Sequence, residues 1–358
     1  MGLMLTTLLA CTVAQVSVGE DTDGLGEADA DTDTDTDTDA DADTDTDADA
    51  DADTDARAPF TLAVLPDTQN YVSSYPEIFT EQTAWILENH EAKNIAFVLH
   101  EGDVTDDNGD EQWARAEASM SLLDGEVPYI LSLGNHDLGP GGNASDRSTD
   151  FDTWFPTSRF ESEPWYGGQM EGRPGDYYTV FNAGGMDFLI VTLEFGPDDD
   201  MLDWAGQVIS SHPDHRAIIV THCYMGSDDS RVGGSHGFSP HNYGLASLGV
   251  NDGDEMWEKL VSAHENIFLV LSGHVTGDGA GQLTSTGNAG NTVHQLLANY
   301  QQFSEGGTGW LRLMEFVPSE NRIDVRTFSP YLWDATGGAE GEEDDPQHHF
   351  SLDYDMSM

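Results

Sequence analysis

Three kinds of residue or segment are scarce in this chain of 358 residues, and each shortage excludes a class of protein. The two cysteines, Cys11 and Cys223, are too few for a disulfide scaffold or for a zinc site built from thiolates. Lysine and arginine together number only 12, against 67 acidic residues. After the first residues, no stretch is long and apolar enough to cross a membrane.

The shortage of basic residues limits the partners of the protein. Residues 20–55 hold 18 acids and no base, which leaves 49 acids and 11 bases in residues 58–358, a net charge of −38. A surface of this sign repels nucleic acid and anionic lipid, so we expect no binding to a nucleic-acid backbone. It suits a salty or extracellular medium, where ions screen the repulsion.

The first 19 residues are interpreted as a targeting segment. The opening MGLMLTTLLAC resembles a bacterial lipoprotein signal, in which Cys11 would carry the lipid, although no Lys or Arg precedes the short apolar run. A plain secretory signal, or a chance cysteine near a frayed terminus, is the alternative. We therefore expect an extracytoplasmic protein, either secreted or held at the bacterial cell envelope, with a lipid on Cys11 as its contact to the membrane.

Residues 20–58 are predicted to be a disordered acidic linker. Aspartate occupies every odd position from 29 to 55 and alternates with Ala or Thr. Such a segment buries too little apolar surface to offset the entropy of ordering, and its like charges extend it. Calcium binding is the weaker alternative, because the turn glycines and the bidentate Glu of calcium loops are missing.

A folded domain is predicted over residues 59–335, followed by an acidic tail over 336–358. Short apolar runs predict strands, and apolar residues at helical spacing predict helices. The expected strands are residues 60–65, 95–99, 127–133, 177–181, 187–193, 217–221 and 267–271, with further β-like alternation over 279–330. The expected helices are residues 76–89, 111–123, 201–210 and 255–264. This alternation of strands and helices indicates an α/β layered domain.

Five of the expected strands are followed at once by a polar loop. These loops are residues 66–69 (PDTQ), 100–106 (HEGDVTD), 134–137 (GNHD), 221–222 (TH) and 272–276 (SGHVT). In α/β sheets the loops at the carboxyl ends of the strands build the ligand site. A single Asp or His in a loop is usually a cap or a hydrogen-bonded residue, but capping does not explain five such loops. Asp, Asn and His together suit Zn, Mn or Fe.

In this order the loops resemble the metal-binding motifs of the calcineurin-like metallophosphoesterases. The motifs at residues 102–106 and 134–137 match in full, whereas Gln69 and Thr276 stand where that family usually has histidines. The sequence DTQ at residues 67–69 resembles a bacterial variant of the family. The resemblance implies an α/β four-layer sandwich, in which two mixed β-sheets are flanked by helices. It also implies a metal-dependent phosphoesterase, either a phosphatase or a phosphodiesterase, acting on a phosphate-ester substrate.

The resemblance further implies two divalent or trivalent metal ions. The ligands that it assigns are Asp67, Gln69, Asp103, Asn135, His222 and His274. Asp103 would bridge both ions, one of which would be held mainly by histidines and the other at the Asp67 half of the site. Mn, Fe or Zn are expected, with Ca or Mg as alternatives at the Asp67 half, because amide and hydroxyl oxygens are harder donors than imidazole. Whether Thr276 or Asp278 completes that half stays open.

The implied chemistry is attack on phosphorus by a hydroxide that the two ions generate from a shared water. By resemblance, His136 would protonate the leaving group or stabilise its charge, and Asp137 would orient the His136 ring. Asp106 is expected to orient a neighbour rather than to bind metal. The alternative is a catalytically weak, metal-binding relative that serves as a surface binding module, since Gln69 and Thr276 would weaken half of the site.

For several other residues the sequence allows two interpretations, a place in the cleft or an ordinary structural role. They are His100, His236, His241, Arg147, Arg173, Arg231 and residues 299–301. Cys223 is expected to pack in the core, because it follows His222 and faces the other way. His348 and His349 are expected to be exposed.

Overall fold

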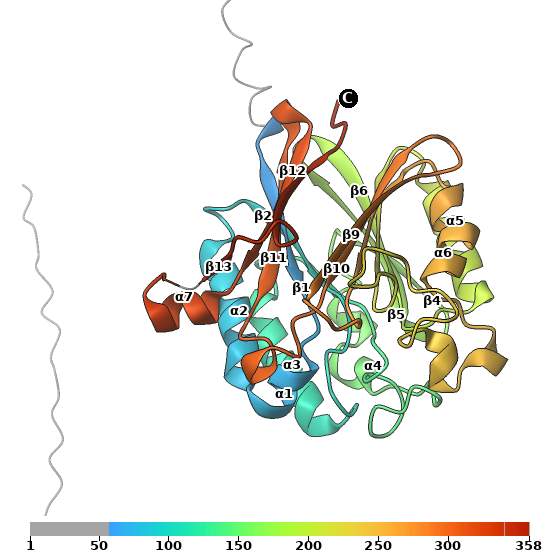
Figure 1. The fold of residues 1–358 in the computed structure, drawn as a ribbon, viewed down its shortest axis with the longest axis horizontal. Helices are drawn as coiled ribbons and strands as arrows, with labels where there is room; N and C mark the ends of the chain where they lie inside the picture. Colours follow the sequence, from blue (N-terminus) through green and yellow to red (C-terminus); the bar gives the residue numbers. More distant parts are fainter. Residues whose placement is uncertain (1–56, 340, 358) are drawn as a thin grey trace, which may run out of the picture. The chain divides into compact units, whose positions relative to one another are not determined.

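The computed structural model describes residues 57–339 and 341–357. The targeting segment with Cys11, and the linker up to residue 56, lie outside the described residues. Within these residues a pair of mixed β-sheets face each other, and helices cover their outer faces (Figure 1). The predicted α/β four-layer sandwich is thus confirmed.

The first sheet is built around three parallel strands. In spatial order its strands are β13 (Glu342–Glu343), β12 (Arg322–Phe328), β11 (Leu311–Val317), β1 (Phe60–Leu65), β2 (Ile95–His100) and β3 (Tyr129–Leu131), and β14 (His349–Asp353) also pairs with β12. Strands β1, β2 and β3 run parallel, and β11 runs antiparallel to β1. The three parallel strands therefore end at one edge, where three of the polar loops begin.

The second sheet contributes the other two polar loops. Its strands, in spatial order, are β4 (Tyr166–Met170), β5 (Arg173–Ala183), β6 (Met186–Leu193), β7 (Arg216–Thr221), β8 (Ile267–Ser272), β10 (Thr292–Ala298) and β9 (Ala280–Thr286). Strands β6, β7, β8 and β10 are parallel neighbours. The central strands are buried on both faces, which is why their sequences are continuous apolar runs rather than alternating ones.

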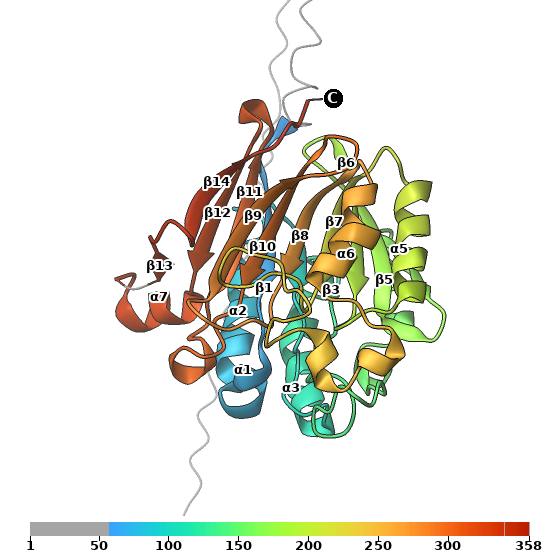
Figure 2. The same cartoon turned by 45° about the vertical axis from the view of Figure 1, so that its right-hand side comes forward.

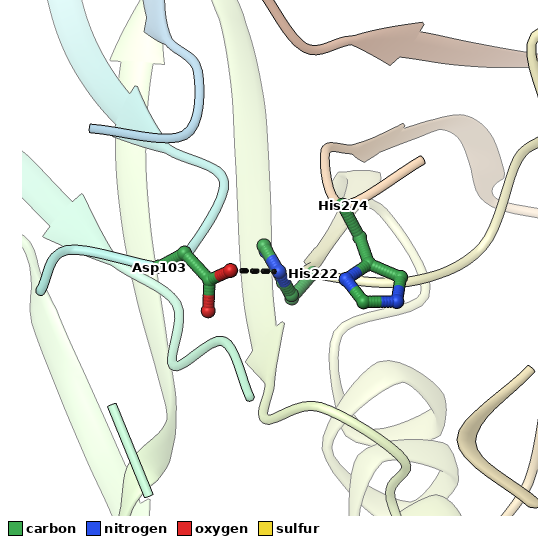
Figure 3. A group of neighbouring side chains, drawn as sticks. All are labelled: Asp103, His222 and His274. Carbon is green, nitrogen blue, oxygen red and sulfur yellow. Dashed lines mark ion pairs between the residues drawn. The ribbon is translucent and has the colours of Figure 1, made fainter. Parts of the chain in front are cut away.

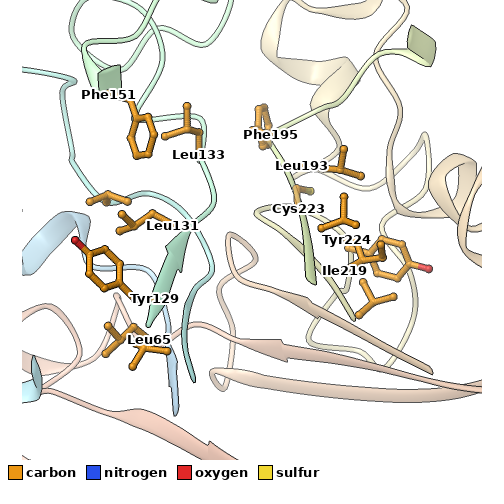
Figure 4. Close-up of a cluster of buried hydrophobic side chains, with 14 of the residues drawn as sticks. Leu65, Tyr129, Leu131, Leu133, Phe151, Leu193, Phe195, Ile219, Cys223 and Tyr224 are labelled. Carbon is orange, nitrogen blue, oxygen red and sulfur yellow. The ribbon is translucent and has the colours of Figure 1, made fainter. Parts of the chain in front are cut away.

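Alternate residues of each strand divide between two apolar layers. On β1, Phe60, Leu62 and Val64 belong to the layer between the sheets, whereas Ala63 and Leu65 pack toward the helices. This division follows from the period of two in a strand. Figure 4 shows some of the second layer, in which Cys223 lies among apolar side chains as expected.

The helices flank the sheets as two outer layers (Figures 1 and 2). They are α1 (Gln69–Ser74), α2 (Pro76–Asn89), α3 (Asp110–Met120), α4 (Phe151–Trp154), α5 (Asp199–Ser211), α6 (Gly253–Lys259) and α7 (Pro330–Thr336). A proline at the first position starts α2, and a capping box between Asp252 and Glu255 starts α6. Helix α6 ends five residues before the predicted end, because Leu260 leaves the helical conformation (φ −124°, ψ −64°). Among the described residues, no helix combines the length and apolar character needed to span a membrane.

The acidic tail expected after residue 335 belongs to the fold. Strand β14 pairs with β12, and its Leu352 lies in the layer between the sheets. Tyr354 stacks on Phe268 of the second sheet, with ring centroids 4.1 Å apart. The prediction that His348 is exposed is wrong, since its side chain is buried beside Tyr300. His349, in contrast, is exposed as expected.

Candidate metal centre

Five loops bring the predicted ligands to one edge of the two sheets. Asp67, Asp103 and Asn135 follow β1, β2 and β3, while His222 and His274 follow β7 and β8. Each of these side chains is at most 4% exposed. A polar group buried this deeply needs a hydrogen-bond partner or a bound ion. The direction of the lone pairs of these side chains therefore decides which ligand the site can bind.

Asp103, His222 and His274 form the centre of the site (Figure 3). Their ligand atoms all lie within 4.8 Å of one another. The Nδ1 of His222 lies 2.9 Å from the carbonyl oxygen of Glu101. A carbonyl can only accept, so Nδ1 carries the proton and Nε2 presents a lone pair 3.0 Å from Oδ2 of Asp103. The lone pairs of these two atoms repel each other at this distance, and a cation bound by both atoms would remove the repulsion.

The ring of His274 is fixed in the opposite tautomer. Its Nε2 lies 3.2 Å from the carbonyl oxygen of Phe238 and 3.1 Å from the hydroxyl of Tyr243. Donation to the carbonyl places the proton on Nε2 and leaves the lone pair on Nδ1, which points toward His222 (Figure 3). Burial first, and the neighbouring His222 second, lower the pKa of His274 to about 3, so the ring is neutral and able to bind metal at ordinary pH.

The Asp67 half of the site is held by a chain of side-chain amides. Gln69 donates from its backbone N–H to Oδ1 of Asp67 at 3.1 Å. Gln301 donates to Oδ2 of Asp67 at 2.6 Å and accepts a hydrogen bond from the side-chain amide of Gln69. This contact orients the amide oxygen of Gln69 away from Gln301. Of the open residues 299–301, Gln301 therefore belongs to the site.

Six buried side-chain atoms in these loops have no hydrogen-bond partner. Two belong to Glu101 and Thr221, and the other four belong to predicted ligands: Oδ2 of Asp103, Nε2 of His222, Oδ1 of Asn135 and Oε1 of Gln69. Unsatisfied buried polar atoms are rare in native proteins, because each one loses its hydration without compensation. All four are oxygen or nitrogen lone pairs of the kind that bind divalent cations. The residues present therefore fit a metal centre, on both the histidine side and the Gln69 side.

The backbone of the ligand loops is strained in a way that suits this role. Asp103 and His274 have positive φ angles of 49° and 69°, which non-glycine residues seldom adopt. Gly134 lies so close to the Asp103 loop that a Cβ there would sit 2.0 Å from Oδ1 of Asp103. The glycine before Asn135 is thus required for close approach of the two loops.

His136 lies beside the centre and is oriented by Asp106. Its backbone N–H donates to Oδ1 of Asp103 at 2.8 Å, and its Nδ1 lies 2.7 Å from the carbonyl oxygen of Asp106. Burial lowers the pKa of His136, but Asp103 and Asp106 raise it more, so that the pKa lies above its ordinary value. The contact is with the backbone of Asp106, whose carboxylate lies 3.6 Å from Nδ1, so an orienting role of the Asp106 side chain stays a prediction.

The expected pairing of Asp137 with the His136 ring is wrong. The two carboxylate oxygens of Asp137 accept from the backbone N–H groups of Val104, Thr105 and Gly134 at 2.7–3.0 Å. Asp137 thereby clamps the Asp103 loop to the Asn135 loop. Burial and the charge of Asp103 raise the pKa of Asp137 to about 7, against these three hydrogen bonds, which lower it.

An aromatic wall on the second sheet was not found from the sequence. The ring of Phe195, just after β6, lies 5.0 Å from the rings of both His274 and Tyr243. Phe238 packs on His274 from the other side at 5.5 Å. Phe238 and Tyr243 lie in a long glycine-rich loop, whose path no local pattern reveals. Their aromatic character beside the histidine motifs was the only available signal.

Of the remaining positions, His100, His236 and His241 make structural contacts, whereas the question whether Thr276 or Asp278 completes the Asp67 half stays open. His100 is buried, accepts from the N–H of Gly102 at Nδ1 and contacts the hydroxyl of Thr68 through Nε2. Thr276 is half-buried, and Asp278 is exposed. His241 contacts Glu255 and Asp252 at the start of α6, whereas the Nδ1 of half-buried His236 accepts from the N–H of Phe238.

Comparison with known proteins identifies the family of this chain. The family model described as calcineurin-like phosphoesterase matches residues 60–282, which is more than half of the chain. The chain belongs to this family, as the sequence motifs predicted.

Two of the similar proteins are much longer than this chain. An uncharacterized protein of Bacillus subtilis, YvnB, is 34% identical over 291 residues; the match covers 78% of this chain and 20% of that protein, so the chain spans about a fifth of its relative's length. A purple acid phosphatase, PPD1, from yellow lupin has a TM-score of 0.51 at 13% identity, covering 83% of this chain and 54% of the lupin chain. GAP50 of Plasmodium has a TM-score of 0.44 at 14% identity, covering 84% of this chain and 90% of that one. The likeness to the lupin enzyme supports the fold alone.

Proposed function

We propose that the protein is a metal-dependent hydrolase of phosphate esters that uses two metal ions held by Asp67, Gln69, Asp103, Asn135, His222 and His274. The observation that carries the proposal is the set of four unpartnered buried lone pairs on both sides of Asp103. When bound, two such ions acidify a water and neutralise phosphoryl oxygens.

The residues of the chain prepare the site for this chemistry. Backbone carbonyls of Glu101 and Phe238 fix the tautomers of His222 and His274, so that one lone pair of each ring points inward. The amide of Gln301 keeps Asp67 and Gln69 in place. Asp137 sets the spacing between the Asp103 and Asn135 loops, which makes it a positioning residue.

His136 is the proposed general acid. Donation from Nδ1 to the carbonyl of Asp106 leaves Nε2 as the atom that faces the leaving group. The side chain is 34% exposed, whereas the metal ligands are closed off, so a substrate can reach it.

We also propose an extracytoplasmic location, with Cys11 carrying a lipid. The acidic composition and the first eleven residues support it. The full chain, expressed in a bacterium fed with a labelled fatty acid, should take up the label, and Cys11→Ser should not. Equal labelling of both proteins, or none of either, contradicts the anchor.

The function is tested by metal content and hydrolysis together. We expect about two ions per chain after purification without chelator, with turnover of a chromogenic phosphate ester that a chelator abolishes. One ion without turnover would instead favour the alternative, a binding module with an incomplete site. Gln69 and Thr276, in place of imidazoles, are the observation behind that alternative.

A further inference from the structure

Lysine and arginine are so few in this protein that the contacts of each one can be described. All 12 lysines and arginines lie within the described residues. Seven form ion pairs with carboxylates: Arg115, Arg147, Arg159, Arg173, Arg231, Lys259 and Arg322. Arg147, Arg173 and Arg231, which the sequence left between a place in the cleft and a structural role, are thus all engaged with acids.

Arg147 and Arg173 share one buried partner. Both contact Glu194, which is 2% exposed, and Arg147 also donates to the carbonyl oxygen of Phe195 at 2.7 Å. Arg173 reaches Asp198 at 3.0 Å as well. Arg231 lies over the ring of Trp257 at 4.3 Å and pairs with Asp254. These arginines neutralise protein carboxylates, and Arg147 also holds the backbone of Phe195 in the aromatic wall.

The other five lysines and arginines lie away from the metal centre or are buried. Arg57, Lys93 and Arg216 lie at or before the amino ends of β1, β2 and β7, while the ligands follow the carboxyl ends. A six-residue strand separates such positions by about 20 Å. Arg326 lines a cavity of about 270 Å³ on the outer face of the first sheet, beside Trp85 and Trp333.

Arg312 is the remaining cation, and it is buried. Arg312 belongs to β11, which lies between β1 and β12; it is 2% exposed and donates to the carbonyl oxygen of Gln347 at 3.3 Å. A substrate cannot reach it. No lysine or arginine among residues 57–339 and 341–357 is therefore free to bind a phosphoryl oxygen at the metal centre.

Carboxylates around the centre add negative charge where basic side chains are missing. Asp67, Asp103 and Asp137 are buried in its loops, and Asp106 lies beside His136. Two divalent ions would carry four positive charges, and these four carboxylates already match them. Each additional negative charge on a substrate thus meets repulsion that no lysine or arginine offsets. We infer that this site prefers singly charged phosphoesters, that is phosphodiesters, over doubly charged phosphomonoesters; the inference rests on the proposed function.

The test separates charge from size with two similar substrates. p-Nitrophenyl phosphate gains its second charge with a pKa of about 6, whereas p-nitrophenyl methylphosphonate keeps one charge and has nearly the same shape. We would measure kcat/KM for both with the manganese-loaded full chain from pH 8 to pH 5. The ratio of the two values cancels the enzyme's own pH dependence. We expect the monoester-to-phosphonate ratio to rise about tenfold or more as the pH falls and the monoester loses its second charge.

Two further measurements sharpen the result. Arg173→Gln and Arg231→Gln should leave the ratio unchanged at pH 8, since neither side chain binds the substrate; a fall in the ratio would show a phosphate contact and overturn the inference. By isothermal titration at pH 8, inorganic phosphate should not bind the metal-free full chain with a Kd below about 1 mM, because no lysine or arginine is available to hold it.

The outcomes test separately the inferred preference for singly charged esters and the proposed hydrolase activity. A ratio that stays flat or falls toward pH 5 means that the site accepts the doubly charged ester, and the inference is wrong although the hydrolase stands. Hydrolysis of neither substrate, at any pH and with Mn²⁺ bound, contradicts the proposed function itself.

Discussion

The two halves of the candidate metal centre are built differently. In the histidine half, backbone carbonyls orient His222 and His274, and aromatic rings pack around His274. In the Asp67 half, the orienting group is another side chain, the amide of Gln301. A backbone carbonyl has no side-chain rotamer of its own, and that of Glu101 directly follows strand β2, whereas an amide side chain depends on its own rotamer. The comparison teaches that the same loop motifs can support one rigid and one adjustable ligand set.

The largest expected effect comes from breaking the rigid half. His222→Ala removes the lone pair that faces Asp103, and should lower kcat/KM about a thousandfold or more. Elemental analysis should show loss of metal in the same variant. His264→Ala, a half-buried histidine bonded to the carbonyl of Leu260, is the matched control and should retain metal and activity. Full activity of His222→Ala would falsify the assignment of the site.

Breaking the adjustable half should have a smaller effect. Gln301→Leu removes the hydrogen bonds to Asp67 and Gln69 without touching a histidine. We expect about 10–100-fold weaker binding of one ion only, since outer partners tune ligands by this amount. A manganese titration should show one tight and one weakened site. Two unchanged sites would mean that Gln301 has no role in the centre; Gln282→Leu, on β9, is the control.

Much of the fold follows from local patterns in the sequence. The runs FTLAVL and IFLVLS form strands that are buried on both faces, and a continuous apolar run has few other solutions in an α/β domain. The tail was misjudged because its composition is acidic. Its residues Phe350, Leu352, Tyr354 and Met356 nevertheless alternate with polar ones, which is the signal of a half-buried strand.

The site was predictable where it depends on loop motifs, and not where it depends on distant contacts. Asp103, Asn135, His222 and His274 each follow a recognisable strand, so topology brings them together. Gln301 lies 234 residues from Asp67 along the chain, and no local pattern reveals that they meet. The role of Asp137 depends on which N–H groups point at it, a detail of backbone direction that the sequence does not carry.

The clamp that joins the loops gives a third test, measured as stability. Asp137→Asn places an NH₂ group against backbone N–H donors, and should lower the free energy of unfolding by about 1–3 kcal/mol. Asp106→Asn should change stability little, because its carboxylate is 39% exposed and lies 3.6 Å from His136. Urea unfolding of the metal-free proteins measures both. If Asp137 is instead a catalytic acid or base, Asp137→Asn will keep its stability and lose kcat.

The smallest effect concerns His100, which joins the Asp67 loop to the Asp103 loop through its contacts with Thr68 and Gly102. Burial, with His222, lowers the pKa of His100 to about 3, so the folded protein keeps this ring neutral where the unfolded chain protonates it near pH 6.5. The unfolded state then holds the extra proton between these values, and acid removes stability by about 1.4 kcal/mol per pH unit for one proton. Metal-free His100→Gln should lose stability less steeply than the unmodified protein between pH 6 and pH 4. Comparing the two slopes cancels the buried carboxyls, such as Glu101, whose raised pKa acts in the opposite direction. Equal slopes would show that His100 is protonated in the folded state, and that its contacts to Thr68 and Gly102 do not join the two loops as described.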